Sequence, residues 1–170
     1  MRPVTGDYNS YYDGYISSIE GNDIMAVLKD QLNSSLKLLG TLSENDGNYT
    51  YAEGKWTVKE LIGHQIDTER IMAYRALSFA RNEKQSQPGF EQDEYVADSN
   101  FNSRPLEELV NEFRLVREAN IILFNSFNDE ILTRRGIASD NEVTVLALIY
   151  IIAGHEKHHM KILHERYLKK

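Results

Sequence analysis

The segment AGHEKHHMKIL, residues 153–163, decides how the end of this chain folds and what its last helix turns inward. It carries three of the five histidines in the sequence. At 100° per residue, His155 and His159 lie about 40° apart on one side of a helix. Apolar residues share that side: Leu148, Ile151, Ile152 and Ile162. The pattern predicts a helix from about Val143 to Leu168 with two imidazoles facing the interior.

Two earlier stretches show the same apolar spacing behind a residue that commonly caps helices. The first is expected over residues 22–42, with Asn22 or Asp23 as its cap. The second begins at Thr57, three residues before Glu60, and continues to about residue 82. This three-residue spacing is that of a capping box, in which the two side chains satisfy exposed N–H groups reciprocally.

A long connection and a third helix follow. Residues 83–103 carry Pro88-Gly89 and scattered aromatic side chains, which indicates a loop long enough to serve a site. Ser103, followed by a proline two residues later, predicts the cap and first turn of a helix that reaches about Phe127.

Together the four amphipathic helices predict an all-α protein, a four-helix bundle with a long connection between helices two and three. We expect a single domain over residues 1–170, because no repeat or low-complexity tract divides the chain. Residues 134–142 resemble a turn between helices three and four. The tyrosine-rich segment from Tyr8 to Tyr15 is expected to pack across the outside or the end of the bundle.

The composition narrows the classes of function. Lys and Arg number 19 against 26 Asp and Glu, for a formal charge of −7, so nucleic acid is not an expected partner. The chain has no cysteine, which excludes disulfides, thiolate metal ligands and a cysteine nucleophile. The N-terminus lacks the apolar run of a signal peptide, and no apolar stretch approaches the roughly 18 residues of a membrane span. We therefore expect a cytoplasmic protein without membrane contact.

Two imidazoles within an apolar stripe lose their hydration and need partners, which one metal ion could provide for both. The HxxxH pair alone also allows hydrogen bonds to carbonyls or carboxylates, so a third ligand would decide. His64 is that candidate, because it lies on the apolar side of the second predicted helix. Taken alone it could be an ordinary core histidine. His158 lies at the edge of the apolar stripe and His164 nearly opposite His155, which makes both weaker candidates.

Three segments together resemble a known family: GKWTVKELIGHQIDTER at residues 54–70, PGFEQDEYVADSNF at residues 88–101, and AGHEKHHMKIL. The chain resembles the DinB/YfiT-like superfamily of bacterial four-helix-bundle proteins. The resemblance implies a divalent metal held by His64, His155 and His159, and a homodimer. Because the family is also similar to thiol-dependent S-transferases and isomerases, it implies a small-molecule substrate and a low-molecular-weight thiol as cosubstrate. Many members have no assigned reaction.

Three neutral imidazoles would leave a metal its full charge and an open position, as in catalytic sites. Such an ion can activate a bound water or thiol, or polarise a carbonyl. Nitrogen ligands suit zinc or nickel best, with iron and copper as alternatives. Since the chain has no cysteine, an activated thiol would have to come from a small cosubstrate.

Several side chains near the histidines could orient them through their second ring nitrogen. The candidates are Glu60, Thr68, Glu69 and His158. For Glu60 we favour helix capping alone, and for Glu156, beside His155, we expect solvation. Glu69 lies on the apolar side of its helix, so a buried, paired and structural carboxylate is expected.

Tyr74 and Arg75 lie toward the long connection and could hold an anionic substrate, although solvent-exposed salt bridging is the favoured role. The sequence leaves three functions open. The first is a metal-dependent enzyme of thiol S-transferase or hydrolase type. The second is a non-catalytic metal- or ligand-binding bundle, and the third is a helical interaction protein whose histidines are only structural.

Overall fold

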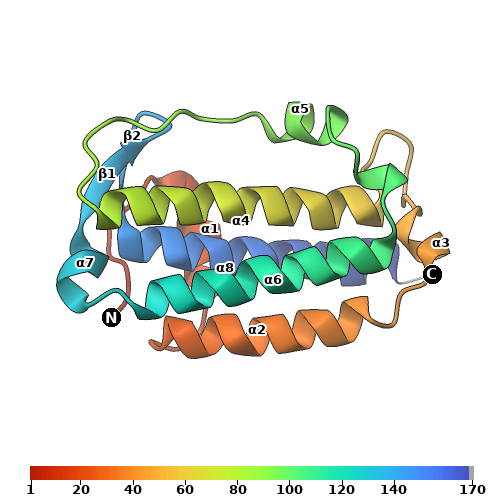
Figure 1. Cartoon of the computed structure of the whole chain (residues 1–170), viewed down its shortest axis with the longest axis horizontal. Helices are drawn as coiled ribbons and strands as arrows, with labels where there is room; N and C mark the ends of the chain where they lie inside the picture. The colour runs from red at the N-terminus through yellow and green to blue at the C-terminus, as the bar shows by residue number, and fades with distance from the viewer. Residues whose placement is uncertain (169–170) are drawn as a thin grey trace.

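The computed structural model describes residues 1–168, which form a bundle of four long helices (Figure 1). These helices are α2 (Ile24–Leu39), α4 (Val58–Ala80), α6 (Leu106–Asn125) and α8 (Val145–Ile162). Helix α4 packs against α6 and α8, and α2 packs against the other side of the same two helices. The predicted all-α bundle is confirmed.

Short elements close the ends and one side of the bundle. A short 3-10 turn, Ser10–Tyr12, leads into α1 (Asp13–Ser18), which lies against α8. The connection between α4 and α6 runs back along the outside of α4 and contains two further short helices (Figure 1). The remaining elements are α3 (Glu44–Gly47), α5 (Gln92–Ala97), the 3-10 turn Phe101–Ser103, α7 (Asp129–Thr133) and a π-helical turn, Leu163–Tyr167, that continues α8.

The starts of two long helices agree with the sequence prediction. The Asp23 side chain accepts a hydrogen bond from the backbone N–H of Ala26 at the start of α2. At the start of α4, both bonds of the Thr57–Glu60 capping box are present. Since Glu60 is engaged with the Thr57 backbone N–H at 2.7 Å, its helix-capping role is confirmed.

The predicted cap of the third helix is wrong. Ser103 lies within the 3-10 turn before α6, and its hydroxyl donates to the Asn100 carbonyl at 2.9 Å. Pro105 occupies the N-cap position, which has no side-chain oxygen to offer. The Glu44 carboxylate on α3 replaces the missing cap, because it accepts from the Leu106 backbone N–H at 2.8 Å.

The segment interpreted as a turn before the last helix is a complete β-hairpin. Strands β1 (Arg135–Ala138) and β2 (Asn141–Thr144) pair antiparallel around a two-residue turn. Ser139 and Asp140 both have positive φ, 50° and 62°, as a type I′ turn requires. Asn-Gly is the common sequence for such a turn, so the Ser-Asp pair of this chain only weakly indicates a hairpin.

The interior has two apolar clusters separated by a polar layer. One cluster joins α1, the hairpin and the first half of α8, whereas the other joins the end of α2, the starts of α4 and α6, and the π-helical turn. A layer of buried polar residues from α4, α6 and α8 lies between these two clusters. They include His64, Thr68, Glu69, Arg117, His155, Glu156 and His159.

Among residues 1–168, no helix has the length and apolar character needed to cross a membrane.

The backbone of α1 approaches α8 directly at Gly154. A Cβ added there would lie 2.4 Å from the Tyr15 carbonyl oxygen, far inside van der Waals contact. We therefore expect Gly154→Ala to lower the free energy of unfolding by about 1–3 kcal/mol, the usual cost of overpacking. Gly14→Ala is the control, because nothing lies within 4 Å of its added Cβ. Denaturant unfolding of the two variants tests this, and equal stability would contradict the close contact.

Candidate metal centre

Three buried histidines converge in the polar layer of the bundle. The Nε2 atom of His155 lies 3.0 Å from that of His64 and 3.0 Å from that of His159. One ring nitrogen from each lies within 4.8 Å of the other two. His64 comes from α4 and the other two from successive turns of α8, so packing of these two helices creates the histidine cluster (His64, His155 and His159).

Burial keeps the histidine cluster neutral. Loss of hydration lowers the pKa of His64 to about 4, opposed by the nearby Asp93 carboxylate. Burial lowers the pKa of His159 to about 3, and the neighbouring imidazoles add to this effect. The pKa of His155 lies well below its usual value for the same reasons. Neutral imidazoles are the form that binds metals.

Hydrogen bonding alone does not satisfy this arrangement. An imidazole nitrogen carries either one proton or one in-plane lone pair, so the His155 Nε2 can complete only one of its two contacts. In addition, the buried Nδ1 of His159 has no hydrogen-bond partner within residues 1–168. Two nitrogens that bind one ion at roughly 2 Å each are separated by roughly 3 Å when the bonds meet near a right angle. The donor set and its spacing fit a divalent metal.

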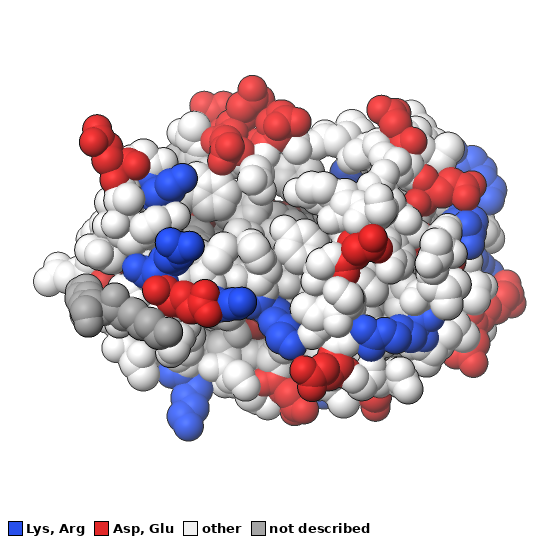
Figure 2. Space-filling view, turned by 180° about the vertical axis from the view of Figure 1, so that it is seen from behind, with Lys and Arg blue, Asp and Glu red and all other residues white. Residues whose placement is uncertain are grey.

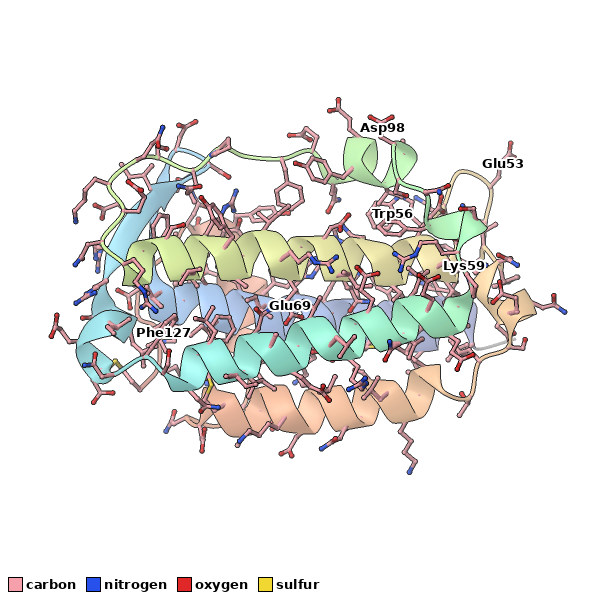
Figure 3. All side chains as sticks on the ribbon, viewed as in Figure 1. Glu53, Trp56, Lys59, Glu69, Asp98 and Phe127 are labelled. Atoms are coloured by element: carbon pink, nitrogen blue, oxygen red, sulfur yellow. The ribbon has the colours of Figure 1, made fainter. Side chains whose placement is uncertain are left out.

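Aromatic rings enclose the histidine cluster from two sides. The Trp56 ring lies 4.8 Å from the His64 ring, between the start of α4 and α5 (Figure 3). Tyr15 of α1 meets the His155 ring edge-on at 5.8 Å. Thr68 Oγ1 lies 3.5 Å from the Nδ1 of His64, at the outer limit of a hydrogen bond.

A pocket of about 440 Å³ opens beside His159. Its other lining residues are Tyr51, Gly54, Lys55, Trp56, Leu61, Asp93, Ile162 and Tyr167. Asp93 belongs to α5, so the long connection supplies a carboxylate to this pocket. The site therefore combines a cluster of imidazoles, an acidic group and aromatic walls on one side of the bundle.

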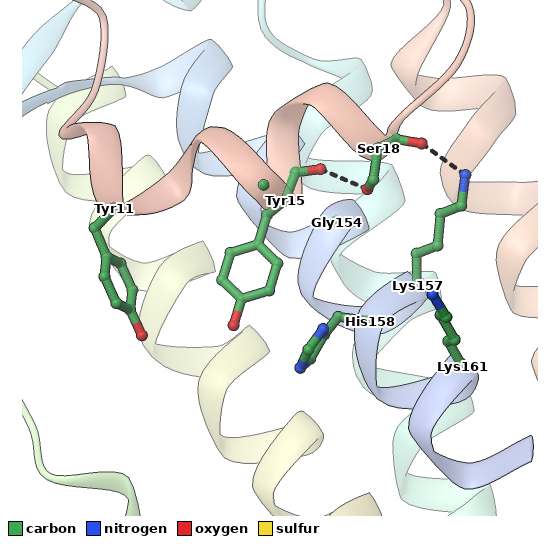
Figure 4. A pocket seen from close by; sticks show the side chains of 8 residues that line it. Tyr11, Tyr15, Ser18, Gly154, Lys157, His158 and Lys161 are labelled. Atoms are coloured by element: carbon green, nitrogen blue, oxygen red, sulfur yellow. Dashed lines mark hydrogen bonds between the residues drawn. The ribbon is translucent and has the colours of Figure 1, made fainter. Parts of the chain in front are cut away.

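A second pocket, of about 490 Å³, is lined by His158 and Tyr15, between α1 and α8 (Figure 4). His158 is exposed and meets the Tyr15 ring at 5.5 Å and the His159 ring at 5.1 Å. Lys157 and Lys161 make this pocket basic. On the face seen from behind, a hollow lies between acidic side chains along the upper edge and a mixed band of basic and acidic ones below (Figure 2).

A buried charge cluster lies directly beside the histidine cluster. Arg117 donates two hydrogen bonds of 2.8 Å to the Glu69 carboxylate and one of 2.5 Å to Glu156. Ser35 donates to the other Glu156 oxygen at 2.6 Å, and Asn120 donates to Glu69 at 3.0 Å. This charge cluster (Glu69, Arg117 and Glu156) links α4, α6 and α8, and Ser35 connects it to α2.

The geometry agrees with the prediction that Glu69 is a buried, paired and structural carboxylate. The prediction that Glu156 is solvated is wrong. Glu156 is 2% exposed, because α6 brings Arg117 over the part of α8 that faces it. The salt-bridging interpretation of Arg75 is also wrong. Arg75 is 3% exposed and takes part in none of the ion pairs among residues 1–168, while Tyr74 is 59% exposed.

Four residues near the site were missed or underrated from the sequence: Tyr15, Trp56, Asp93 and Arg117. Only Arg117 left a usable signal, because it occurs at helical spacing between the apolar Phe113, Ile121 and Phe124. The other three reach the site through loops and short helices, whose packing has no periodic signature. Of the weaker histidines, His158 lies next to the site and His164 is exposed.

The fold and the histidine cluster define a helical bundle with a candidate metal centre. Comparison with known proteins shows the family to which this bundle belongs. Residues 28–163 match the model of the DinB superfamily. The chain belongs to this family. The matched range contains the whole histidine cluster and the charge cluster.

The relatives agree in their descriptions. The chain is 24% identical over 123 residues to a protein of Oceanobacillus iheyensis named "Putative metal-dependent hydrolase OB0413", covering 72% of this chain and 70% of the relative. YfiT from Bacillus subtilis, described as "a probable metal-dependent hydrolase with an unusual four-helix bundle topology", matches with a TM-score of 0.72. That match covers 86% of this chain and 90% of YfiT at 13% identity, and so shows the fold alone.

Two further solved structures share the fold. A mycothiol-dependent maleylpyruvate isomerase matches with a TM-score of 0.68 and 10% identity, covering 85% of this chain and 61% of the isomerase. A DinB-like protein from Bacillus subtilis matches with a TM-score of 0.62 and 18% identity, covering 87% of this chain and 92% of that one. The same bundle therefore occurs in proteins described with different activities.

The lowered histidine pKa values predict an acid-sensitive metal-free protein. Histidines in the unfolded chain bind protons below about pH 6.5, whereas His64 in the folded protein binds one only near pH 4. The free energy of unfolding therefore decreases as the pH is lowered through this window. Each such histidine contributes a slope of about 1.4 kcal/mol per pH unit. Thermal unfolding of metal-free protein from pH 7 to pH 5 measures the slope. His64→Gln should reduce the slope by the contribution of one histidine. A stability that does not change with pH in the parent protein would contradict buried neutral histidines.

The charge cluster predicts a strong asymmetry between two arginines of α6. Arg117→Met should lower the free energy of unfolding by about 3–5 kcal/mol, because two buried carboxylates lose their counter-charge. Arg114→Met is the control, since its salt bridge to Glu118 is solvent-exposed and worth under about 1 kcal/mol. Urea unfolding compares the two. Similar losses in both variants would show that Arg117 is not the buried counter-ion.

Proposed function

We propose that the protein is a metal-dependent enzyme of hydrolase type, whose divalent metal is held by the histidine cluster. The observation that carries the proposal is the convergence of three buried ring nitrogens on one point, with the His155 Nε2 at 3.0 Å from each of the others. The DinB membership and the relatives described as metal-dependent hydrolases support it. Zinc or nickel is the expected ion, because the donors are all nitrogen.

When bound, a divalent ion lowers the pKa of a coordinated water or thiol and polarises a carbonyl. The chain's own residues supply the rest of the site. The pocket beside His159 receives the substrate, a small molecule, between the rings of Tyr51, Trp56 and Tyr167. Asp93 lines the same pocket and accepts the proton that the attacking group releases. Thr68 and the charge cluster hold the histidine-bearing helices in place.

A thiol S-transferase is the second candidate. The chain has no cysteine, so a thiol at this site would come from a low-molecular-weight cosubstrate. A structural neighbour is described as mycothiol-dependent, which supports the same chemistry. The proposal further includes a homodimer in the cytoplasm with neither nucleic acid nor membrane as partner. A non-catalytic metal-binding bundle is the alternative that an absence of turnover would favour.

Metal binding is tested by titration calorimetry with zinc and nickel at neutral pH. We expect one ion per chain, and a loss of affinity of at least about a hundredfold in His64→Ala, His155→Ala or His159→Ala, since losing an outer partner of a ligand already costs 10- to 100-fold. His164→Ala is the matched control and should bind like the parent, because His164 is exposed. His158→Ala should weaken binding less than the ligand variants. Parent-like binding in all five variants would remove the proposed site.

Turnover separates the two reaction types. Metal-loaded protein is assayed with activated esters in water, and with an electrophile plus cysteine or glutathione. Asp93→Asn should lower kcat by about 10²–10⁴ while metal affinity stays unchanged, because Asp93 acts on a proton. Ester turnover without thiol supports the hydrolase, and thiol-dependent turnover supports the transferase. Activity that persists in His155→Ala would show that the metal centre does not carry the reaction.

A further inference from the structure

Arg75 is a buried cation without a counter-ion. It is 3% exposed, and no ion pair among residues 1–168 includes it. Its Nη2 donates to the Pro88 carbonyl at 2.6 Å and to the Ser139 hydroxyl at 3.3 Å, and its Nη1 approaches the Met72 sulfur at 3.6 Å. A guanidinium has five N–H donors, so these three bonds leave two of them free.

This arginine lines a pocket of about 200 Å³ at the hairpin end of the bundle. The walls come from the 3-10 turn before α1, from α4, the hairpin and α8, and they include Asn9, Tyr12, Ser139 and Asn141. Glu142 is the acidic residue in the lining, and it is engaged by Arg135 at 3.3 Å. The pocket therefore surrounds an uncompensated positive charge with hydroxyl and amide donors.

Burying a charge without a partner is unfavourable, and it persists where a ligand supplies the missing charge. A guanidinium fork with free donors matches the paired oxygens of a carboxylate or a phosphate. We propose that Arg75 forms the centre of an anion-binding site that takes the carboxylate or phosphate group of a small molecule, with Ser139 and Tyr12 as further contacts.

The position of this site relates it to the metal centre. Ile151 lines the pocket and precedes His155 by one helical turn of α8, about 6 Å along the axis. Tyr11 lines both this pocket and the basic pocket that His158 borders. A ligand anchored at Arg75 can therefore extend past Tyr11 toward His158, beside the histidine cluster, which would make the thiol cosubstrate an acid. This last step rests on the proposed function, whereas anion binding itself does not.

The test uses metal-free protein, so that its outcome is independent of the metal centre. Thermal unfolding is followed in inorganic phosphate and, separately, in benzoate, against chloride at equal ionic strength. Either anion should raise the Tm by about 2–4 °C at saturating millimolar concentration. Stabilisation by phosphate alone assigns a phosphate-bearing ligand, and stabilisation by benzoate alone assigns a carboxylate. If neither anion stabilises the protein beyond chloride, the proposal is overturned.

Two variants place the effect at Arg75. Arg75→Met should lose the anion response, whereas Arg81→Met, an exposed arginine at the end of the same helix, should keep it. Ser139→Asp keeps Arg75 and gives it an internal counter-ion. Aspartate tolerates the positive φ of that position, so the variant should fold, gain stability without ligand and lose the response. An undiminished response in Ser139→Asp or in folded Arg75→Met would overturn the proposal.

Discussion

The ion pairs of Arg117 are the interaction on which the rest of the structure depends. This side chain of α6 reaches Glu69 on α4 and Glu156 on α8, and Ser35 of α2 completes the contact. Buried ion pairs contribute little net stability, because desolvation offsets most of their attraction. Their effect here is on register. We infer that any shift of α4 along α8 would leave a buried carboxylate without its partner Arg117. The ion pairs therefore keep His64 opposite His155.

The same charges also set the electrostatics of the candidate metal centre. Within the charge cluster, two carboxylates face one guanidinium, and a crevice of about 10 Å³ is lined by both Glu156 and the neighbouring His155. Burial prevents the histidines from supplying the balancing positive charge, since it lowers their pKa values. A divalent cation held by neutral imidazoles would supply that charge without a proton.

The sequence predicted the features that follow from local periodicity. Apolar spacing located the four long helices, the Thr57–Glu60 pair marked the start of α4, and the HxxxH spacing put two histidines on the inner side of α8. The errors came from contacts between residues distant in sequence. The burial of Glu156 depends on Arg117, which lies 39 residues away. The burial of Arg75 depends on a hairpin whose Ser-Asp turn is uncommon.

The central claim is that one metal ion is held by three imidazoles inside the bundle. X-ray absorption spectroscopy at the metal edge of zinc- or nickel-loaded protein tests this most directly, because it reports the type and number of ligands around the ion. The account predicts three imidazole nitrogens at about 2.0–2.1 Å, with the remaining position filled by water. A spectrum with one imidazole or none, dominated by carboxylate or water oxygens, would place the ion elsewhere and contradict the account.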